Sequence, residues 1–431
     1  MRATERERGS AFDLLAAWAP GGFLIERGGE GVAGAGVAAR VTGIGGPGRF
    51  ARLAREVEAT FATISRSSGE ALFAVGGATF ATVSRSSGEA LFAVGGASFA
   101  GDEDASLVVP ARTIVRRGGR VVEIDIADGV AGVAAPPVVA SWPAAVPSDP
   151  FAHLVPEPTP GAYRDAVRRA ARTIRDGLGA DALRKVVLAR SIVVDAEREL
   201  DVRALLARLR AVDPDAYVFA VPASGPDGTL VGASPELLVR KVGRTIATTP
   251  LAGSAPRFGD PDEDRASAER LFASEKDREE HRLVVEDVVA ALDPLCHELS
   301  FPAEPELVRT ANVWHLATPF TGLLEDGVRS VLDVLDALHP TAAVSGLPRA
   351  AATEAIARLE SLDRDGYAGP VGWVDDHGDG EWAIALRCAL VTGSTARLFA
   401  GAGIVGASDP VAEEEETERK FRASLDALRW G

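Results

Sequence analysis

The stretch TLVGASPELLVRKVGRTIATTPL (residues 229–251) predicts two β-strands joined by a turn at Ser234-Pro235. Another strand, AYVFAV (216–221), precedes it, and helical patterns lie on both sides. Strands that follow one another in pairs between helices favour antiparallel sheets. We therefore expect an α+β fold rather than a doubly wound α/β fold.

The rest of the C-terminal part alternates helices and strands in the same way. Residues 161–179 carry apolar residues at helical spacing and end on glycines 177 and 179, which is typical of a helix C-terminus. One long amphipathic helix is expected over residues 262–293, and a last helix from about residue 410. The other expected elements are KVVLARSIVVD (185–195), the helix LDVRALLARLRAV (200–212), and the strands GPVGWV (369–374), AIALRCALV (383–391) and ARLFAGAGIV (396–405).

A proline-rich segment divides the chain. Eight prolines lie within residues 134–160, so this segment is expected to be an extended connector rather than a regular helix or a central strand. It separates a β-rich N-terminal half, residues 1–133, from a catalytic region, residues 161–431, in which helices and strands mix.

The N-terminal half contains a tandem duplication. Residues 61–79 recur at 80–98 with two differences, Ile64/Val83 and Thr79/Ser98. Two copies are too few for a solenoid, which needs at least three stacked units. Each copy predicts a short strand, a Ser-Ser-Gly turn and a second strand, so we expect an extra hairpin. A local duplication without a function of its own accounts for it.

Composition limits the possible partners. The 46 basic and 62 acidic side chains of the 431 residues give a net formal charge of −16, which argues against nucleic acid or an anionic membrane. An anionic substrate stays possible, because a metal and a few local cations can reverse the field in a cleft. The two cysteines form no CxxC motif, and no run of 18 apolar residues exists. We expect a soluble, cytoplasmic protein.

Two apparent motifs are rejected. GAGIVG (401–406) matches GxGxxG, but a dinucleotide-binding site also needs a helix opening on the last glycine and a second parallel strand. Here Ser408-Asp409-Pro410 intervenes, and one helix ends the chain. The six histidines show no metal-ligand spacing. His281 is expected to be a helix-packing residue.

Paired carboxylates are the strongest chemical signal. Asp277 and Glu280 are three positions apart in one helical run, as are Glu413 and Glu416 in another, so each pair shares a helix face. If the fold brings the pairs together, they form a hard, oxygen-only site suited to Mg²⁺ and an anionic ligand. The alternative for the run at 413–416 is a solvated helix face.

Nine runs between residues 161 and 431 resemble the chorismate-utilising enzymes, and among them the isochorismate synthases. They occur in the order found in that family. The runs are KVVLAR (185–190), GASPELL (232–238), PLAGSAPR (250–257), SEKDREEH (274–281), WHLATPF (314–320), LHPTAAVSG (338–346), GPVGWVD (369–375), LRCA (386–389) and LFAGAGIV (398–405).

The resemblance implies two stacked antiparallel sheets flanked by helices, and an isomerase that converts chorismate to isochorismate. Water adds at one ring carbon while the hydroxyl leaves from another, which needs a base, an acid and neutralisation of the ring carboxylate. By position, Lys185 matches the family's base and Glu236 its acid.

The resemblance also implies the ligands. Glu280 and Glu416 match direct Mg²⁺ ligands, and Asp277 and Glu413 match residues that hold metal-bound waters. The positions that match substrate-contacting residues are Gly253, Ser254, His315, Ala343, Tyr367, Arg387, Gly403 and Lys420.

These substrate positions divide by the group that they would contact. Gly253 and Ser254 would donate to the ring carboxylate, and Gly403 would donate its amide to the pyruvyl carboxylate. Arg387 and Lys420 would supply positive charge. His315 matches a residue near the ring hydroxyl, and Tyr367 one near the pyruvyl end.

The residues at positions 185, 339 and 343 favour the isochorismate synthases within the family. Amine-using members have Gln at the position of Lys185. The lyases that expel pyruvate usually have Thr and Phe where this chain has Ala343 and His339. A salicylate synthase and a catalytically inactive chorismate-binding protein remain alternatives. The family expectation is a monomer, and the product could feed menaquinone or siderophore synthesis.

Overall fold

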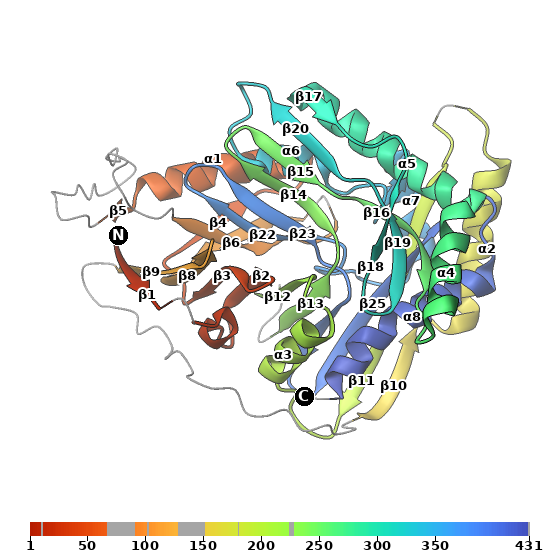
Figure 1. Ribbon diagram of the computed structural model, residues 1–431, viewed down its shortest axis with the longest axis horizontal. Coiled ribbons are helices and arrows are strands. Elements are labelled where there is room, and N and C mark those ends of the chain that lie inside the picture. The colour runs from red at the N-terminus through yellow and green to blue at the C-terminus, as the bar shows by residue number, and fades with distance from the viewer. Residues whose placement is uncertain are drawn as a thin grey trace.

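The computed structural model describes residues 1–9, 12–66, 91–100, 103–127, 151–179, 181–223 and 228–429. Over these ranges the strands form two large sheets and one small sheet, with helices around them (Figure 1). Strand pairs are antiparallel, apart from the parallel pair β1–β5. The predicted α+β fold with two antiparallel sheets is confirmed, and the small third sheet is an addition that the sequence did not indicate.

The larger sheet has thirteen strands and draws on both halves of the sequence. The N-terminal hairpin β2–β3 continues the sheet directly from β12, so the two halves share one sheet rather than forming separate domains. In spatial order the strands are β10 (Phe151–Glu157), β11 (Lys185–Ala196), β25 (Thr395–Ile404), β24 (Cys388–Thr392), β13 (Thr229–Ser234), β12 (Tyr217–Pro222), β2 (Phe23–Arg27), β3 (Glu30–Ala35), β8 (Arg112–Arg117), β9 (Arg120–Ala127), β1 (Arg2–Arg8) and β5 (Ser65–Arg66), with β21 (Gly346–Leu347) paired to β11.

The second sheet has nine strands and is likewise shared between the halves. Its order is β17 (Cys296–Ser300), β20 (Phe320–Leu324), β15 (Thr245–Thr248), β14 (Leu237–Val242), β23 (Gly380–Ile384), β22 (Pro370–Asp375), β6 (Phe92–Gly96), β7 (Ala105–Val109) and β4 (Ala39–Gly43). The small sheet contains β16 (Leu251–Pro256), β19 (Val313–Ala317) and β18 (Glu306–Arg309).

Eight α-helices and two short 3-10 helices accompany the sheets in the described part of the chain. They are η1 (Leu14–Ala17), α1 (Arg49–Ala62), α2 (Pro160–Asp176), α3 (Val202–Val212), α4 (Pro261–Ala273), α5 (Glu275–Leu292), η2 (Asp293–Leu295), α6 (Val331–Leu338), α7 (Arg349–Leu359) and α8 (Pro410–Leu428). In Figure 1, α2 and α8 lie beside β10, β11 and β25, while α1 and α6 lie along the second sheet.

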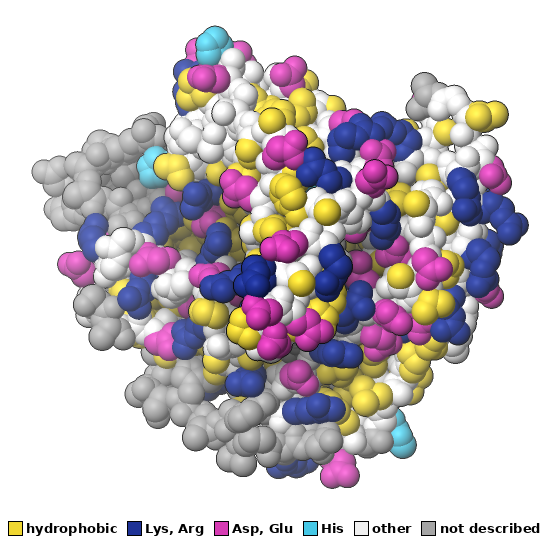
Figure 2. Space-filling view, turned by 45° about the vertical axis from the view of Figure 1, so that its right-hand side comes forward, with side chains coloured by type: hydrophobic (Ala, Val, Ile, Leu, Met, Phe, Trp, Pro, Cys, Tyr) yellow, Lys and Arg dark blue, Asp and Glu magenta, His cyan; other side chains and the backbone are white. Residues whose placement is uncertain are grey.

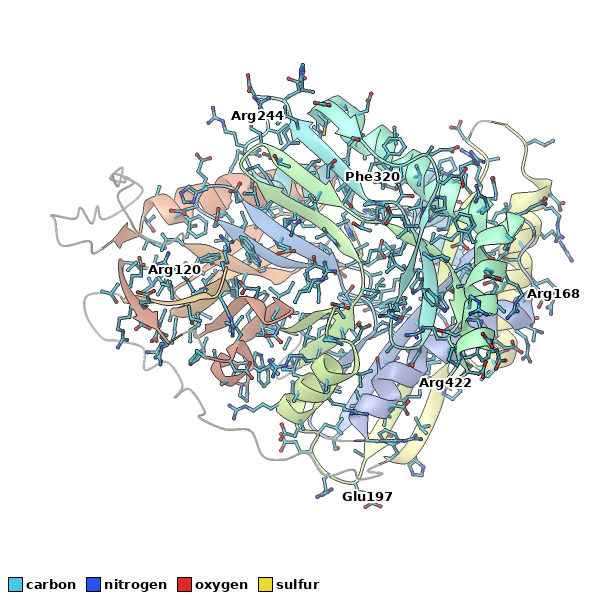
Figure 3. The ribbon with its side chains drawn as sticks, viewed as in Figure 1. Arg120, Arg168, Glu197, Arg244, Phe320 and Arg422 are labelled. Atoms are coloured by element: carbon cyan, nitrogen blue, oxygen red, sulfur yellow. The ribbon has the colours of Figure 1, made fainter. Side chains whose placement is uncertain are left out.

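The main hydrophobic core lies between the two large sheets. It includes Phe219 of β12 together with Val239 of β14 and Trp382 of β23, all fully buried. Phe219 stands opposite Gly232 of β13, where a Cβ would lie 2.7 Å from the ring, so a side chain at 232 would displace the core. A second core joins α3 and α8 to the larger sheet. Phe320 lies among interior side chains, whereas Arg168 projects outward from α2 (Figure 3).

The chain passes between the large sheets at two adjacent places, which corrects two strand predictions. Residues 229–251 contain three complete strands rather than two, because β13 ends at Ser234 and β14 begins at Leu237 in the other sheet. The segment AIALRCALV contains two strands, since Arg387 takes a left-handed φ of 50° between β23 and β24. Hydrogen bonds from Ile384 N to Glu236 O and from Ala233 N to Arg387 O join the two crossings.

The predicted single helix over 262–293 is wrong, because it is two helices. α4 ends and α5 begins at Ser274, whose extended backbone breaks the helix. The Ser274 hydroxyl accepts a hydrogen bond from Asp277 N and so caps the new helix. The break places Asp277 in the first turn of α5 instead of the middle of a long helix.

The duplication and the connector are described only in part. The first copy begins inside α1, so the strand predicted at its start is wrong for residues 61–62. The end of the second copy forms β6, as expected of its second strand. Residues 67–90, and with them the predicted turns, lie outside the described residues. Of the connector, residues 134–150 also lie outside them, and 151–157 form the edge strand β10.

The surface carries charges of both signs. Figure 2 shows acidic and basic side chains interspersed over the face that it presents. Among the described residues, no helix is long and apolar enough to cross a membrane.

Replacing Phe219 tests the core between the sheets. Phe219→Ala is expected to lower the free energy of unfolding by about 3–5 kcal/mol, because loss of the fully buried ring leaves a cavity between the two large sheets. Denaturant unfolding measures the change. Leu178→Ala, at a side chain that is 94% exposed, serves as the control and is expected to change stability by less than about 0.5 kcal/mol. Equal effects of the two substitutions would contradict this account of the core.

Candidate active site

Two helices bring their first turns together beside β11 and β25. Asp277 and Glu413 lie in the first turns of α5 and α8, which are capped by Ser274 and Asp409. The helix N-termini carry partial positive charge and therefore stabilise nearby carboxylates. One turn further along each helix come the second members of the predicted pairs, Glu280 and Glu416.

Each of three carboxylates is ion-paired with a different lysine. Lys185 Nζ of β11 lies 3.3 Å from Glu280 Oε1. Lys276 Nζ of α5 lies 2.7 Å from Glu413 Oε1, and Lys420 Nζ of α8 lies 2.7 Å from Glu416 Oε1. Residues from three elements far apart in sequence thus form one charged cluster, which we call the carboxylate–lysine cluster: Asp277, Glu280, Glu413, Glu416, Lys185, Lys276 and Lys420.

Lys276 was missed by the sequence reasoning. It precedes Asp277 and lies four residues before Glu280, so its position on the predicted helix already placed it on the carboxylate face. It was not recognised because it lies within SEKDREEH, and a run of charged residues usually forms a solvated surface.

The carboxylates hold negative charge in a confined space. Burial raises the pKa of Glu413, and the charge of Glu416 raises it further, against the effect of Lys276. Burial also acts to raise the pKa of Glu416, but the ammonium groups of Lys420 and Lys276 hold it well below its usual value. The pKa of Asp277 is raised, mainly by burial. Buried carboxylates without enough positive charge form a donor set that fits a hard divalent cation such as Mg²⁺.

The cluster is nevertheless not a preformed metal cage. Among the described residues, three potential ligand atoms lie within 4.8 Å of one another only at Asp375, Asp376 and His377. That group belongs to the β22–β23 turn, where Asp375 Oδ1 accepts hydrogen bonds from His377 N and Asp379 N. In the carboxylate–lysine cluster three of the four carboxylates are each ion-paired with a lysine instead.

Lys185 and Glu236 are both buried close to the cluster. Lys185 is 0% exposed, and its Nζ makes no hydrogen bond to any described residue. Glu236 lies at the crossing between β13 and β14 and is 3% exposed. Burial raises its pKa to about 7, although Leu251 N and the charges of Lys185, Arg387 and Lys420 act in the opposite direction. A carboxyl group that keeps its proton near neutral pH can act as a general acid.

The second crossing orients a buried arginine. Arg387 Nη2 donates to His315 Nε2 at 3.2 Å, and His315 Nδ1 donates to Gly253 O at 3.2 Å. This chain requires a neutral imidazole with its proton on Nδ1. Burial and the charges of Arg387 and Lys420 lower the pKa of His315 to about 3, which agrees with that tautomer. Gly253 itself has a φ of +72°, so another residue there would be strained.

Glycines of β25 allow side chains to approach the strand. A Cβ at Gly403 would lie 2.0 Å from Glu280 Oε1 and 3.0 Å from Lys185 Cε. Gly401 O accepts a hydrogen bond from Lys420 Nζ at 2.7 Å. A Cβ at Gly401 would lie 3.0 Å from the hydroxyl of Tyr367, whose ring stacks on Phe399. The glycines of the GxG pattern, which resembles a nucleotide-binding motif, therefore leave space for the side chains of Glu280, Lys185 and Tyr367.

Several buried polar atoms have no hydrogen-bond partner among the described residues. They include Thr341 Oγ1 in the loop before β21 and Lys185 Nζ, whose contact with Glu280 is an ion pair. Buried donors and acceptors are normally satisfied, so atoms of this kind indicate contact with a polar ligand or water. The side chain of Ser254 in β16 acts on Glu416 and lowers the pKa of that carboxyl group. Ala343 lies in the same loop and packs against Ala252 and Val284.

A large cavity lies elsewhere. A space of about 650 Å³ opens between the large sheets and is lined by residues of both halves of the sequence, such as Phe23, Gly95 and Pro222. None of the predicted site residues lines it. Charge, burial and unpaired polar atoms, rather than cavity volume, therefore locate the candidate active site.

The raised pKa of Glu236 has a consequence for stability. Its folded-state pKa of about 7 exceeds the ordinary value of 4.5, so the folded protein keeps a proton that the unfolded chain loses between these pH values. The contribution of this proton to the free energy of unfolding is complete below pH 4.5 and is lost as the pH rises to about 7.

We expect the free energy of unfolding of the wild type, relative to Glu236→Gln, to fall by up to about 3 kcal/mol between pH 4.5 and 8. Urea unfolding of both proteins at several pH values measures this difference. A difference that does not change with pH would contradict the assigned environment of Glu236.

Comparisons with known proteins show which family the chain resembles. The family model described as chorismate binding enzyme matches residues 23–429. A Mycobacterium tuberculosis protein assigned as isochorismate synthase MenF is 49% identical over 280 residues, which are 63% of this chain and 74% of that protein. The isochorismate synthase DhbC of Bacillus subtilis is 42% identical over 281 residues, 64% of this chain and 70% of the relative.

A solved structure is similar over nearly the whole chain. The Bacillus anthracis protein assigned as DhbC, a 2,3-dihydroxybenzoate-specific isochorismate synthase, superposes with a TM-score of 0.79 at 32% identity. The match covers 97% of this chain and 99% of that protein. With the family model spanning both large sheets and the carboxylate–lysine cluster, this protein belongs to the chorismate-binding enzyme family.

Proposed function

We propose that the protein is an isochorismate synthase that converts chorismate to isochorismate with the help of Mg²⁺. The observation that carries the proposal is the presence of two buried groups: Glu236, a carboxyl whose pKa is raised to about 7, and Lys185, a lysine of the carboxylate–lysine cluster whose charge acts on Glu236. A binding protein needs no acid and base of this kind. The names of the relatives support the same activity.

In the proposed reaction, Lys185 takes a proton from the attacking water and Glu236 gives a proton to the leaving hydroxyl. A C–O bond forms at one ring carbon as another breaks across the diene, so the water consumed equals the water released. Lys185 must first lose its own proton and its ion pair with Glu280, 3.3 Å away. Glu236 already holds a proton near neutral pH, which favours its role as the acid.

The other site residues would bind the two carboxylates of the substrate. Arg387, held by His315, and Lys420, held by Gly401 O, would grip the pyruvyl carboxylate together with the amide of Gly403. Ser254 Oγ and the backbone of Gly253 would donate to the ring carboxylate. Tyr367 would contact the pyruvyl end.

Mg²⁺ would be held directly by Glu280 and Glu416, and through water by Asp277 and Glu413. When bound, it would neutralise the ring carboxylate, whose charge otherwise meets four protein carboxylates. Oxygen ligands at the N-terminal turns of two helices suit this cation.

Release of isochorismate without further cleavage is part of the proposal. Ala343 offers only a methyl group to the site, where the pyruvate-expelling relatives usually carry a hydroxyl. We infer that the protein works in the cytoplasm as a monomer with chorismate as its small-molecule partner. The unpaired cysteines, Cys296 and Cys388, suit a reducing compartment.

Incubation with chorismate tests the function. We expect isochorismate with Mg²⁺, none with EDTA, and no pyruvate in either case, as measured by chromatography of the products. Lys185→Ala and Glu236→Gln are each expected to lower kcat by about 10²–10⁴-fold, because each removes one proton-transfer group. Arg164→Met, at a surface ion pair with Glu414, is the control and is expected to keep wild-type turnover.

Salicylate with stoichiometric pyruvate would instead identify a salicylate synthase. Unchanged chorismate at saturating Mg²⁺ would identify a binding protein.

A further inference from the structure

The three lysines of the carboxylate–lysine cluster differ in their freedom to leave it. Lys185 is completely buried, with its side chain 0% exposed. Lys420 is 13% exposed and is held twice, by Glu416 and by Gly401 O. Lys276 is 28% exposed and lies at the solvent side of the cluster, where it is paired with Glu413. Lys276 is thus the most exposed of the three lysines, with an ion pair to one carboxylate of the cluster.

The charges make one lysine redundant once a divalent cation binds. Four carboxylates face three ammonium groups, so the cluster carries one net negative formal charge. A divalent cation would turn this into one net positive charge. If one ammonium then leaves, the formal charges balance. A lysine is suited to leaving, because its ammonium is strongly hydrated and sits on a flexible four-carbon side chain.

The position of Lys276 also opposes metal coordination directly. Its Nζ lies within hydrogen-bond distance of Glu413 Oε1, an oxygen that a cation or its water would otherwise use. Its charge also acts on Glu280 and Glu416, so it influences three of the four carboxylates. The carboxylate oxygens of the cluster, moreover, do not form a ready-made cage in the described part of the chain.

We propose that Lys276 is a built-in counterion that competes with the divalent cation for Glu413 and swings into solvent when the cation binds. The inference rests on the metal site of the proposed function. It makes Lys276 a residue that sets cation affinity, rather than a ligand or a catalytic group. It also means that entry of the cation includes the breaking of an internal ion pair, which raises the cation concentration needed to fill the site.

The test measures binding of the metal alone, without chorismate. MgCl₂ is titrated into the full chain by calorimetry, for the wild type, for the neutral variants Lys276→Met and Lys276→Gln, and for the charge-retaining Lys276→Arg. Both neutral variants are expected to bind Mg²⁺ about tenfold more tightly, because the competing charge is gone. Lys276→Arg is expected to stay within about threefold of the wild type, because it keeps the charge that competes for the carboxylate.

A matched control is an ion pair between α2 and α8. Arg164 pairs with Glu414 of α8 at 2.6 Å, outside the cluster. Arg164→Met removes a positive charge from an ion pair with α8 and is expected to leave the Mg²⁺ affinity unchanged. A tightening in this control equal to that of Lys276→Met would mean that overall charge is responsible, which would overturn the proposal.

Thermal unfolding supplies a second readout. In EDTA, the neutral variants are expected to unfold at lower temperature than the wild type, because Glu413 has lost its counterion. Saturating Mg²⁺ is expected to remove this difference. The same dependence on metal is not expected of Arg164→Met.

The outcomes separate the inference from the function on which it rests. If the wild type binds Mg²⁺ and both neutral variants bind it equally or more weakly, the role of Lys276 is refuted while the metal site stands. If the wild type does not bind Mg²⁺ at all, the metal site of the proposed function and this inference both fail.

Discussion

The architecture depends on two neighbouring places where the chain leaves one large sheet for the other. Hydrogen bonds between Ile384 and Glu236 and between Ala233 and Arg387 hold these crossings together. On one side of them β13 pairs with β24, and on the other side β14 pairs with β23. A residue at a crossing belongs to no strand, so its side chain is not bound to the alternating orientation of strand residues. Glu236, the candidate general acid, and the buried Arg387 occupy the two crossings.

The candidate site also depends on a balance of buried charge. Two helix N-termini and three ammonium groups surround four carboxylates in a region that water reaches poorly. Such charges are costly to bury unless each has a partner. The observed ion pairs meet that requirement for three of the four carboxylates, Glu280, Glu413 and Glu416. Any cation or anionic substrate that enters must therefore exchange partners with these side chains rather than simply fill a space.

Much of the site could be predicted because its parts are encoded by local spacing. The i,i+3 carboxylates and Lys420 four residues after Glu416 share helix faces by geometry alone, and Glu236 follows a proline that ends a strand. The sequence reasoning failed where one continuous helix or strand and two consecutive ones have the same apolar pattern. It joined α4 and α5, because Ser274 interrupts the helix without disturbing the apolar spacing, and it joined β23 and β24, because both flanks of Arg387 are apolar. It did not single out Lys276, because a lysine within a run of charged residues usually lies on a solvated surface.

The sequence by itself predicted the fold class, most strands and helices, and the candidate carboxylates, glycines and two of the three lysines, Lys185 and Lys420. These follow from periodicity, from proline and glycine geometry, and from motifs that resemble a known family. The tertiary structure alone decided that adjacent strands belong to different sheets and that Lys276 meets Glu413 across two helices. It also decided that Glu236 is buried deeply enough to hold its proton. Each of these depends on contacts between residues distant in the chain, and local pattern carries no information about which distant partner packs against a given face.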